Sequence, residues 1–426
     1  MRLMPTPASP VRLIPQMPPR QGQSGTSTGV NTAPGSDDDG WIVPEPVTLA
    51  DGTILQLLKD GEALHVAYRS IESARRRICM EFYTFASDDT GRAFADLLCR
   101  KAREGVKIYL IYDSFGCVDT DESIFNDMRR AGVRLAEFNP LKPWRCRFSW
   151  RPYNRDHRKM IVIDDEIGGL GGLNLGANYA GSWVVRDSKC VDLWRDTAIG
   201  MRGPSVKLLL RAFHGSWRYV HQGGRVRKAE FVYGLDAMDA DPQDPPAEMA
   251  LIACVPTRSS PLRPLLKKLF LNARDSIDLT MAYFAPDDDL VQNLCKASRR
   301  GVRVRLMLPG RSDVPVLQLA ARSFYETLLV AGVQIFERRD VVLHSKTMVI
   351  DQNTSLIGST NLDYRSIEYN LEVSVLVKSN QLGTQMRTLF EHDVQFSDRI
   401  DLGQWRKRHF TDRFVQWAVS RARYLL

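Results

Sequence analysis

The sequence predicts an α/β protein built from two tandem copies of one unit, and three observations support this prediction. The pattern H-x-K-x4-D occurs twice, at His157–Asp164 and at His344–Asp351. Each copy follows a series of segments in which strand patterns alternate with helix patterns. Short stretches of one series reappear in the same order in the other. Alternating strands and helices are typical of a sheet that carries helices on both faces.

The first half contains the elements that such a unit needs. Apolar residues at helical spacing predict a helix over Ala63–Arg77, and an apolar run predicts a strand over Ile78–Phe85. A second helix is predicted over Gly91–Glu104, where Gly105 ends it. The remaining predicted elements before the motif are a strand at Val106–Tyr112, a helix at Ile124–Ala131 and a strand at Val133–Phe138.

The second half repeats this series. Ala273–Ile277 corresponds to Ala74–Ile78, and Arg300–Val304 corresponds to Glu104–Ile108. Both series end in the apolar strand that carries the motif. The sequence therefore indicates a tandem duplication.

The composition along the chain predicts where the domains begin and end. Residues 1–40 are rich in Pro, Ser, Gly and Thr and are predicted to be disordered. The two copies are joined through 223–248, where the Asp and Pro residues are typical of a loop. We expect a first domain over 41–222, a second domain over 249–399 and a basic amphipathic tail over 400–426.

Length and charge limit the classes of protein and partner. With 426 residues and 44% hydrophobic content, the chain can bury a substantial core. The net charge of +8 favours an anionic partner, either nucleic acid or an anionic membrane surface, and does not choose between them. No apolar run reaches the length of about 18 residues that a membrane-spanning helix needs. The seven scattered cysteines, never spaced as C-x-x-C, predict reduced, mostly buried thiols of a cytosolic-type compartment, without a zinc site or disulfide framework.

The motif itself suits the chemistry of a phosphate ester. Met160–Asp164 is a short apolar run of the kind found in buried strands, as is its counterpart in the second copy. Side chains two residues apart on a strand share a face, so His157 points the same way as Lys159, and His344 the same way as Lys346. A lysine supplies charge and donors to phosphate oxygens, whereas a histidine can attack phosphorus or carry a proton.

Further polar residues recur after each motif. Asn174 and Asn361 each follow the motif histidine by 17 residues, and they add donors for phosphate, as does the hydroxyl of Ser359. If the two halves pack with their motifs face to face, one histidine can be the nucleophile and the other the general acid. The glycine run Gly168–Gly172 lacks the spacing of a dinucleotide-binding loop. We interpret it as a close backbone approach beside the phosphate site that leaves room for Asn174.

The duplicated motif resembles that of the phospholipase D superfamily, and the surrounding sequence resembles its bacterial cardiolipin synthase branch, in a form without transmembrane helices. The likeness runs from about residue 50 to the end of the chain. It implies two tandem phospholipase D-like α/β/α domains related by pseudo-twofold symmetry, with the active site at their interface. The matching segments are Asn154–Lys159, Gly171–Asn174, Trp194–Thr197, Gly358–Ser366 and Asn370–Glu372.

The resemblance also implies roles for individual residues, with no metal or cofactor. The candidate catalytic residues are those of the two motifs: His157, Lys159, Asp164, His344, Lys346 and Asp351. The candidate phosphate-binding or supporting residues are Asn174, Asn361, Ser359, Asp196 and Glu372, of which the two acids would orient the histidines.

The acids differ in how securely the sequence places them. Asp164 and Asp351 lie five residues beyond the motif lysine, at the far end of the strand, so we interpret them as structural or ion-paired. Asp196 follows the first histidine by 39 residues, whereas Glu372 follows the second by 28. This difference implies an insertion around 182–192 in the first half.

The function that the resemblance implies is that of a cardiolipin synthase. Such an enzyme transfers a phosphatidyl group between phospholipids through a covalent phosphohistidine, with phosphatidylglycerol as donor and acceptor. The expected location is the cytoplasmic side of the inner membrane, where the enzyme would act peripherally on an anionic surface. The alternative is a phospholipase D-type phosphodiesterase that hydrolyses phospholipid or nucleic acid, although nucleic acid is the disfavoured substrate. A third reading, a membrane-bound scaffold, is disfavoured because both motifs are intact.

Two segments suit contact with a membrane. Basic and aromatic residues alternate over 139–156, which is typical of an interfacial lip, of a platform for single-stranded nucleic acid, or of a loop packed on the fold. Aromatic and basic residues also alternate over Trp405–Leu426, which fits either a helix on a membrane surface or a helix docked on the core.

Overall fold

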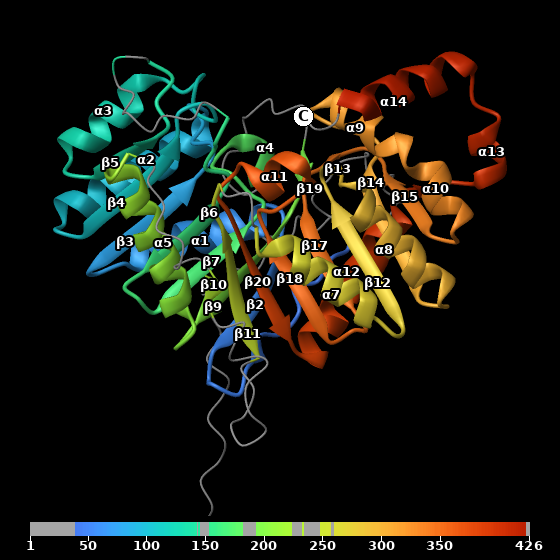
Figure 1. Cartoon of the computed structure of the whole chain (residues 1–426). Helices are drawn as coiled ribbons and strands as arrows, with labels where there is room; N and C mark the ends of the chain where they lie inside the picture. The colour runs from blue at the N-terminus through green and yellow to red at the C-terminus, as the bar shows by residue number, and fades with distance from the viewer. Residues whose placement is uncertain are drawn as a thin grey trace, which may run out of the picture.

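The chain folds into two α/β halves, each built on one large mixed sheet (Figure 1). The computed structural model describes residues 39–142, 144, 153–181, 193–223, 232–233, 248–256 and 260–422. Most of the expected joint over 223–248 and the expected insertion over 182–192 lie outside the described residues. The α/β class and the duplication that the sequence predicts are confirmed.

The first half contains an eight-stranded sheet with the order β1-β2-β9-β7-β6-β3-β4-β5. Its strands are β1 (Val47–Thr48), β2 (Ile54–Lys59), β3 (Arg77–Phe82), β4 (Lys107–Asp113), β5 (Arg134–Phe138), β6 (Lys159–Ile163), β7 (Ile167–Gly171) and β9 (Thr197–Arg202). Its helices are α1 (Gly61–Ser73), α2 (Asp89–Arg103), α3 (Glu122–Arg130), α4 (Ala177–Ala180) and α5 (Val206–His221).

The second half contains a nine-stranded sheet with the order β10-β11-β20-β18-β17-β12-β14-β15-β21. Its strands are β10 (Val232–Tyr233), β11 (Met249–Cys254), β12 (Ser276–Met281), β14 (Arg303–Pro309), β15 (Gln334–Arg338), β17 (Lys346–Ile350), β18 (Thr354–Gly358), β20 (Glu372–Lys378) and β21 (Ser397–Arg399). Its helices are α7 (Leu262–Asn272), α8 (Asp288–Arg299), α9 (Pro315–Ser323), α10 (Tyr325–Val330), α11 (Tyr364–Glu368), α12 (Asn380–Gln395), α13 (Leu402–Arg406) and α14 (Phe410–Ala422). Two small sheets pair β13 (Phe284–Ala285) with β19 (Leu362–Asp363) and β16 (Val342–Leu343) with β8 (Trp194–Arg195).

The two large sheets share one strand order. In each, the first three strands of the predicted series are parallel, and the motif strand joins them antiparallel: β6 beside β3, and β17 beside β12. The sequence did not predict that the glycine run is itself a strand, β7. Glycine has a low strand propensity, so the pattern of Ile167–Gly171 gave no strand signal. The sheet supplies the partners that hold this segment extended, because β6 and β9 pair with it on either side.

The core consists of three apolar layers, one within each half and one between the halves. Helices α1, α2 and α3 pack on one face of the first sheet, and α7, α8 and α10 pack on the corresponding face of the second. Between the sheets lies a shared core to which both halves contribute, for example Met160 and Leu170 from the first and Val373 and Val375 from the second. Burial of apolar surface in this shared core is the main force that docks the two halves.

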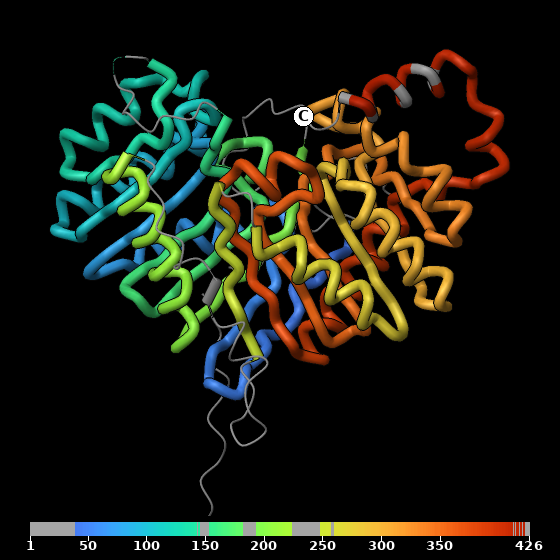
Figure 2. Tube along the Cα trace, in the orientation of Figure 1, coloured from blue at the N-terminus to red at the C-terminus, as the bar shows by residue number. Residues whose placement is uncertain are grey.

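The N-terminal segment crosses to the second half (Figure 2). The side chain of Gln385 on α12 donates a hydrogen bond to the carbonyl oxygen of Glu45 (2.8 Å). Asp39 accepts a hydrogen bond from the ammonium of Lys59 (2.7 Å) and lies 3.1 Å from Nε2 of His392. Residues 39 and 40, the last two of the segment predicted to be disordered, belong to the described residues, and Lys59 and His392 hold the Asp39 carboxylate. Residues 1–38 lie outside the described residues.

The C-terminal segment packs on the second half. Trp405 packs against the core of that half, with its ring centroid 4.8 Å from that of Tyr325, and α14 lies against α9. For Trp405, the docked alternative that the sequence left open is the one observed. Among the described residues, no helix combines the length and apolar character needed to cross a bilayer.

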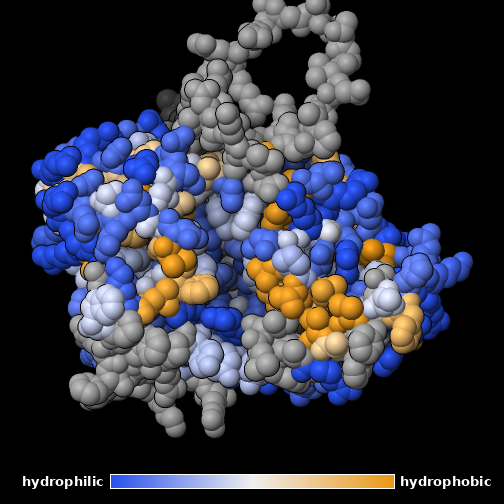
Figure 3. Space-filling view, turned by 90° about the horizontal axis from the view of Figure 1, so that it is seen from above, coloured by the Kyte–Doolittle hydropathy of each residue, from blue (hydrophilic) through white to orange (hydrophobic). Residues whose placement is uncertain are grey.

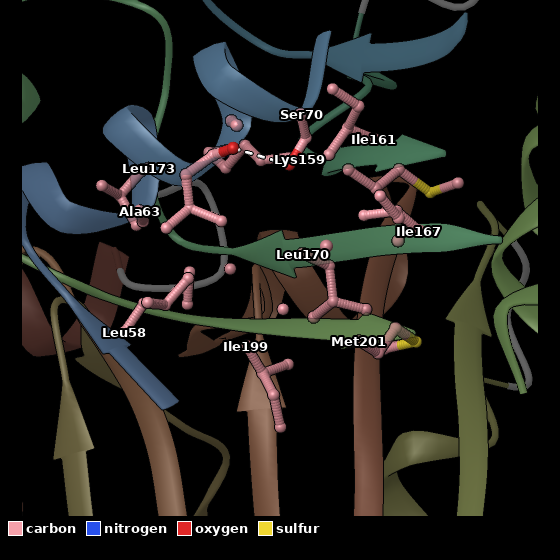
Figure 4. A pocket seen from close by; sticks show the side chains of 18 of the residues that line it. Leu58, Ala63, Ser70, Lys159, Ile161, Ile167, Leu170, Leu173, Ile199 and Met201 are labelled. Carbon is pink, nitrogen blue, oxygen red and sulfur yellow. Dashed lines mark hydrogen bonds between the residues drawn. The ribbon is translucent and has the colours of Figure 1, made fainter. Parts of the chain in front are cut away.

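A cavity of about 70 Å³ lies between α1 and the first sheet (Figure 4). Gly169 on β7 pairs with Gly200 on β9, and both line this cavity. The corresponding pair in the second sheet is Leu356 and Leu376, whose side chains fill the core beneath the helices of that half. The cavity therefore arises because two glycines replace the leucines of the other copy.

Replacing Gly169 by alanine should stabilise the protein. A Cβ there would lie 3.5 Å from Cγ2 of Ile161 and 3.7 Å from the carbonyl oxygen of Ile199, which are ordinary contacts. We expect Gly169→Ala to raise the free energy of unfolding by about 0.5–1 kcal/mol, because a methyl group is buried and the unfolded chain loses freedom. Urea unfolding measures the change.

Gly171→Ala is the matched control on the same strand. Its Cβ would lie 2.6 Å from the carbonyl oxygen of Thr197 and 2.7 Å from Cα of Ala198, so this variant should unfold at lower urea concentration than wild type. Equal loss of stability in both variants would contradict the assignment of an open space at Gly169.

Candidate active site

Both motif histidines open on one cavity at the junction of the two halves. This cavity has a volume of about 510 Å³, and His157, His344, Asn174 and Asn361 line it together. Figure 3 shows the surface hollowed between the halves on this side, with apolar side chains on either side of the hollow. The face-to-face packing that the duplicated motif predicts is therefore the arrangement observed.

The backbone at each histidine pairs with the opposite half. The N–H of His157 donates to the carbonyl oxygen of Leu371 (2.9 Å), and the N–H of Leu371 donates to the carbonyl oxygen of Arg155 (2.8 Å). In the other copy, the N–H of His344 donates to the carbonyl oxygen of Arg195 (2.8 Å), which continues the pairing of β16 with β8. Each histidine is thus tied to the residue that precedes an acid of the other half.

The side chains also pair each histidine with an acid of the opposite half. Nδ1 of His157 lies 3.0 Å from Oε1 of Glu372, and Nδ1 of His344 lies 2.7 Å from Oδ2 of Asp196. A carboxylate at Nδ1 fixes the tautomer and orientation of the ring, which leaves Nε2 for chemistry. The sequence comparison measured each acid from the histidine of its own half, whereas the structure pairs each acid with the histidine of the other.

Burial governs the charges of these pairs. It lowers the pKa of the His157 and His344 imidazoles well below their usual range. Burial also raises the pKa of the Asp196 and Glu372 carboxyls to about 7. Both shifts have the same cause, because a low dielectric penalises the charged form of each group. An uncharged imidazole is the form that can act as a nucleophile.

The motif lysines lie directly behind the histidines. The ammonium of Lys159 donates to the carbonyl oxygen of His157 (2.7 Å), and the ammonium of Lys346 donates to the carbonyl oxygen of His344. Burial lowers the pKa of Lys159 to about 7 and that of Lys346 to about 8. Lys159 also lines the cavity beneath α1 (Figure 4), so its apolar stem packs in the fold while its ammonium reaches the backbone of His157.

The two asparagines are held by the backbone. Oδ1 of Asn174 accepts a hydrogen bond from the N–H of Thr84 (3.1 Å), and Oδ1 of Asn361 accepts one from the N–H of Tyr283 (3.3 Å). With its oxygen fixed in this way, each carboxamide presents N–H groups as donors to its surroundings. Ser359, which the sequence placed near the phosphate, instead donates its hydroxyl hydrogen to Glu372.

Asp164 and Asp351 are not part of the site. The carboxylate of Asp164 accepts hydrogen bonds from the backbone N–H groups of Arg75–Arg77 at 2.7–2.8 Å. That of Asp351 binds the backbone of Arg274–Ser276 in the same way. Both residues close the turn before a sheet strand, at the far end of the motif strand. Their place among the catalytic candidates is therefore corrected, and the structural reading of them is the one observed.

The glycine run makes room for an acid. A Cβ on Gly172 would overlap the carboxylate of Asp196, so only glycine lets that side chain reach His344. In the second copy, the corresponding residue is Ser359, whose hydroxyl supports Glu372. The close approach that the sequence predicts is present, but the group that benefits from it is Asp196 and not Asn174.

Sequence reasoning missed the aromatic and charged residues that complete the cavity. The rings of Tyr179, Trp194 and Tyr283 surround His344, with centroids 5.5, 5.0 and 6.2 Å from the imidazole. Arg365 and Asp313 also line the cavity. None of them belongs to an H-x-K-x4-D motif, but Trp194 and Arg365 lie in the matching segments Trp194–Thr197 and Gly358–Ser366, which gave a signal for them.

The predicted lip over 139–156 is described only in part, since residues 143 and 145–152 lie outside the described residues. Within the described part, Trp144 is 80% exposed and Tyr153 is 72% exposed. Phe115, which lines the cavity, is 52% exposed. Large aromatic side chains are therefore exposed at the cavity and on the segment that leads to it.

Comparison with known proteins identifies relatives of this chain. A family model described as cardiolipin synthase, PLD-like domain, matches residues 68–183 and 266–394. The cardiolipin synthase of Alkalihalophilus pseudofirmus is 31% identical over 374 residues, which are 87% of this chain and 71% of that protein. The cardiolipin synthase of Geobacillus kaustophilus is 32% identical over 89% of this chain and 73% of its own length.

Solved structures share the fold. A phosphatidylserine synthase of Haemophilus influenzae superposes with a TM-score of 0.65 at 13% identity, over 89% of this chain and 97% of that one. A polyphosphate kinase of Porphyromonas gingivalis superposes with a TM-score of 0.52 at 15% identity, over 86% of this chain and 55% of that one. At these identities the likeness is one of fold.

The exchanged pairing predicts which imidazole responds to a change in each acid. We expect Asp196→Asn to alter the ring nitrogen signals of His344 in ¹⁵N spectra of histidine-labelled protein, because the amide no longer fixes the tautomer. The signals of His157 should change far less. Glu372→Gln is the matched variant and should have the reverse effect. A response of His157 to Asp196→Asn would contradict the pairing.

Proposed function

The chain belongs to the cardiolipin synthase family of PLD-like proteins, and from this we propose that it is a cardiolipin synthase that uses phosphatidylglycerol as donor and acceptor. Membership makes it a phosphatidyltransferase of the phospholipase D superfamily. The observation that carries the proposal is the cavity that both motif histidines line, each with an acid at Nδ1.

The proposed reaction has two steps. In the first, Nε2 of His157 attacks phosphorus, the bond to the alcohol oxygen breaks, and His344 gives its proton to that oxygen. In the second, His344 removes a proton from the incoming hydroxyl, whose oxygen attacks phosphorus and releases His157. The asparagine amides and the cations Lys159 and Lys346 would stabilise the charge on the non-bridging oxygens.

Charges around the cavity support this assignment of roles. Burial lowers the pKa of His157, and the cations Lys159, Lys346 and Arg365 lower it further. Burial and Lys346 also lower the pKa of His344, but the carboxylate of Asp313 raises it. The two histidines thus differ in that Arg365 disfavours a proton on His157, as suits a nucleophile, whereas Asp313 favours one on His344, as suits a general acid.

Transfer requires that a lipid alcohol reach the intermediate before water does. The aromatic rings of Tyr179, Trp194 and Tyr283 line the cavity and take space that water would occupy. Exclusion of water favours transfer over hydrolysis.

We propose that the protein acts peripherally on the cytoplasmic face of the inner membrane. Exposed Phe115, Trp144 and Tyr153 support this, because aromatic side chains favour the depth of lipid headgroups. The net charge of +8 would favour an anionic surface.

Lipid composition tests the function directly. Cells that lack cardiolipin and express the wild-type chain should accumulate cardiolipin, whereas cells expressing His157→Ala should not, and mass spectrometry of their lipids measures this. His214→Ala, which changes an exposed histidine outside the cavity, is the matched control and should behave as wild type. Cardiolipin in cells with His157→Ala, or none with wild type, would refute the proposal.

Trapping experiments test which histidine is the nucleophile. Loss of the general acid alone should lower the rate by roughly 10²- to 10⁴-fold. His344→Ala should still accept labelled phosphatidyl from phosphatidylglycerol as an acid-labile adduct, and His157→Ala should not. Label that survives in His157→Ala and disappears in His344→Ala would reverse the two roles.

A further inference from the structure

A carboxylate faces the cavity that we propose binds an anionic phosphodiester. Asp313 lies on the loop between β14 and α9, its side chain is exposed, and it lines the same cavity as the two histidines. Like charges repel, so a carboxylate in this position weakens phosphate binding. The presence of Asp313 therefore suits contact with a part of the substrate other than the phosphate.

Asp313 is held in a defined position. The hydroxyl of Tyr283 donates a hydrogen bond to Oδ2 of Asp313 (2.7 Å), and Tyr283 is itself fixed through its backbone N–H, which donates to Asn361. The only other side-chain contact of this carboxylate within the described part of the chain is with the neighbouring Ser312, at 3.5 Å. Oδ1 therefore keeps lone pairs that can accept hydrogen bonds from a ligand.

The two ends of the cavity differ in charge. Arg365 and Arg155 line the cavity together with His157, and Asp313 with Tyr283 lies at His344. A phosphodiester has the same asymmetry, since the phosphate is anionic and the headgroup alcohol carries hydrogen-bond donors. In the proposed reaction the leaving oxygen lies next to His344, so its headgroup is placed beside Asp313.

We propose that Asp313 and Tyr283 form a headgroup subsite that binds the free hydroxyl groups of a polyol, such as the glycerol of phosphatidylglycerol. The inference rests on the proposed function, because it places the leaving and the incoming alcohol at His344. One hydroxyl oxygen of the polyol is the atom that leaves phosphorus with the bonding electron pair and takes the proton of His344. A second hydroxyl of the same polyol donates a hydrogen bond to Oδ1 of Asp313.

The surroundings favour a neutral headgroup over a cationic one. Lys346 lies close enough to interact with the charge of Asp313. This cation partly balances the carboxylate, and it would repel an ammonium group placed beside it. Hydroxyl groups make the hydrogen bond without adding charge. The rings of Tyr179 and Trp194 offer apolar surface to the carbon atoms of the headgroup.

Two donor lipids that differ only in headgroup hydroxyls test the subsite. We compare kcat/KM for alcohol release from phosphatidylglycerol and from phosphatidylpropanol in otherwise identical vesicles. Asp313→Ala should lower kcat/KM about 10- to 100-fold with phosphatidylglycerol and no more than about threefold with phosphatidylpropanol, because only the first lipid loses a hydrogen-bond acceptor. Tyr283→Phe should show the same selectivity with a smaller loss, and Asp313→Asn, which keeps an acceptor oxygen, should retain part of the preference.

Controls separate the possible outcomes. Asp289→Ala removes an exposed carboxylate on α8, outside the cavity, and should leave both rates unchanged. An equal loss with both lipids in Asp313→Ala would overturn the proposed subsite. It would indicate instead that Asp313 acts by favouring the protonated form of His344. If alcohol release were faster from phosphatidylethanolamine than from phosphatidylglycerol, and Asp313→Asn abolished this difference, the subsite would bind an ammonium group and not a polyol. Wild-type protein inactive on all three lipids would instead refute the proposed function, and this inference with it.

Discussion

The exchange of partners between the two halves is the interaction on which the rest of the site depends. Glu372 belongs to the second half but holds His157, and Asp196 belongs to the first but holds His344. The backbone makes the same exchange one residue earlier, where Leu371 and Arg195 pair with the histidine segments. Each motif histidine thus has its acid in the opposite half. The chemistry that we propose is therefore a property of the docked pair.

This exchange places ionisable groups where they are costly to keep. Both histidines, both lysines and both acids are buried, and burial shifts the pKa of each towards its uncharged form. Such a cluster is tolerated only where each group has a hydrogen-bond partner. The shared apolar core between the sheets supplies the favourable free energy that keeps these partners together.

The two copies have the same framework and differ in the residues that surround the two histidines. Gly172 admits the carboxylate of Asp196, whereas its counterpart Ser359 supports Glu372 with a hydroxyl. Asp313 lies at the end of the cavity that holds His344, and Arg365 acts on His157 at the other. A symmetric cavity would treat the two histidines alike. These asymmetries support the proposal that His157 is the nucleophile and His344 the general acid.

The sequence by itself determined the duplication, the strand-and-helix series of each copy, and the two histidines and two asparagines that meet at the cavity. These follow from repeated local patterns, and a pattern such as His157 with Lys159 needs only neighbouring residues to be recognised. Tertiary structure alone decided which acid serves which histidine, because partners 148 and 215 positions apart meet only when the halves dock. It also decided the place of Asp313, which belongs to no motif and faces the cavity only because the loop before α9 folds over it.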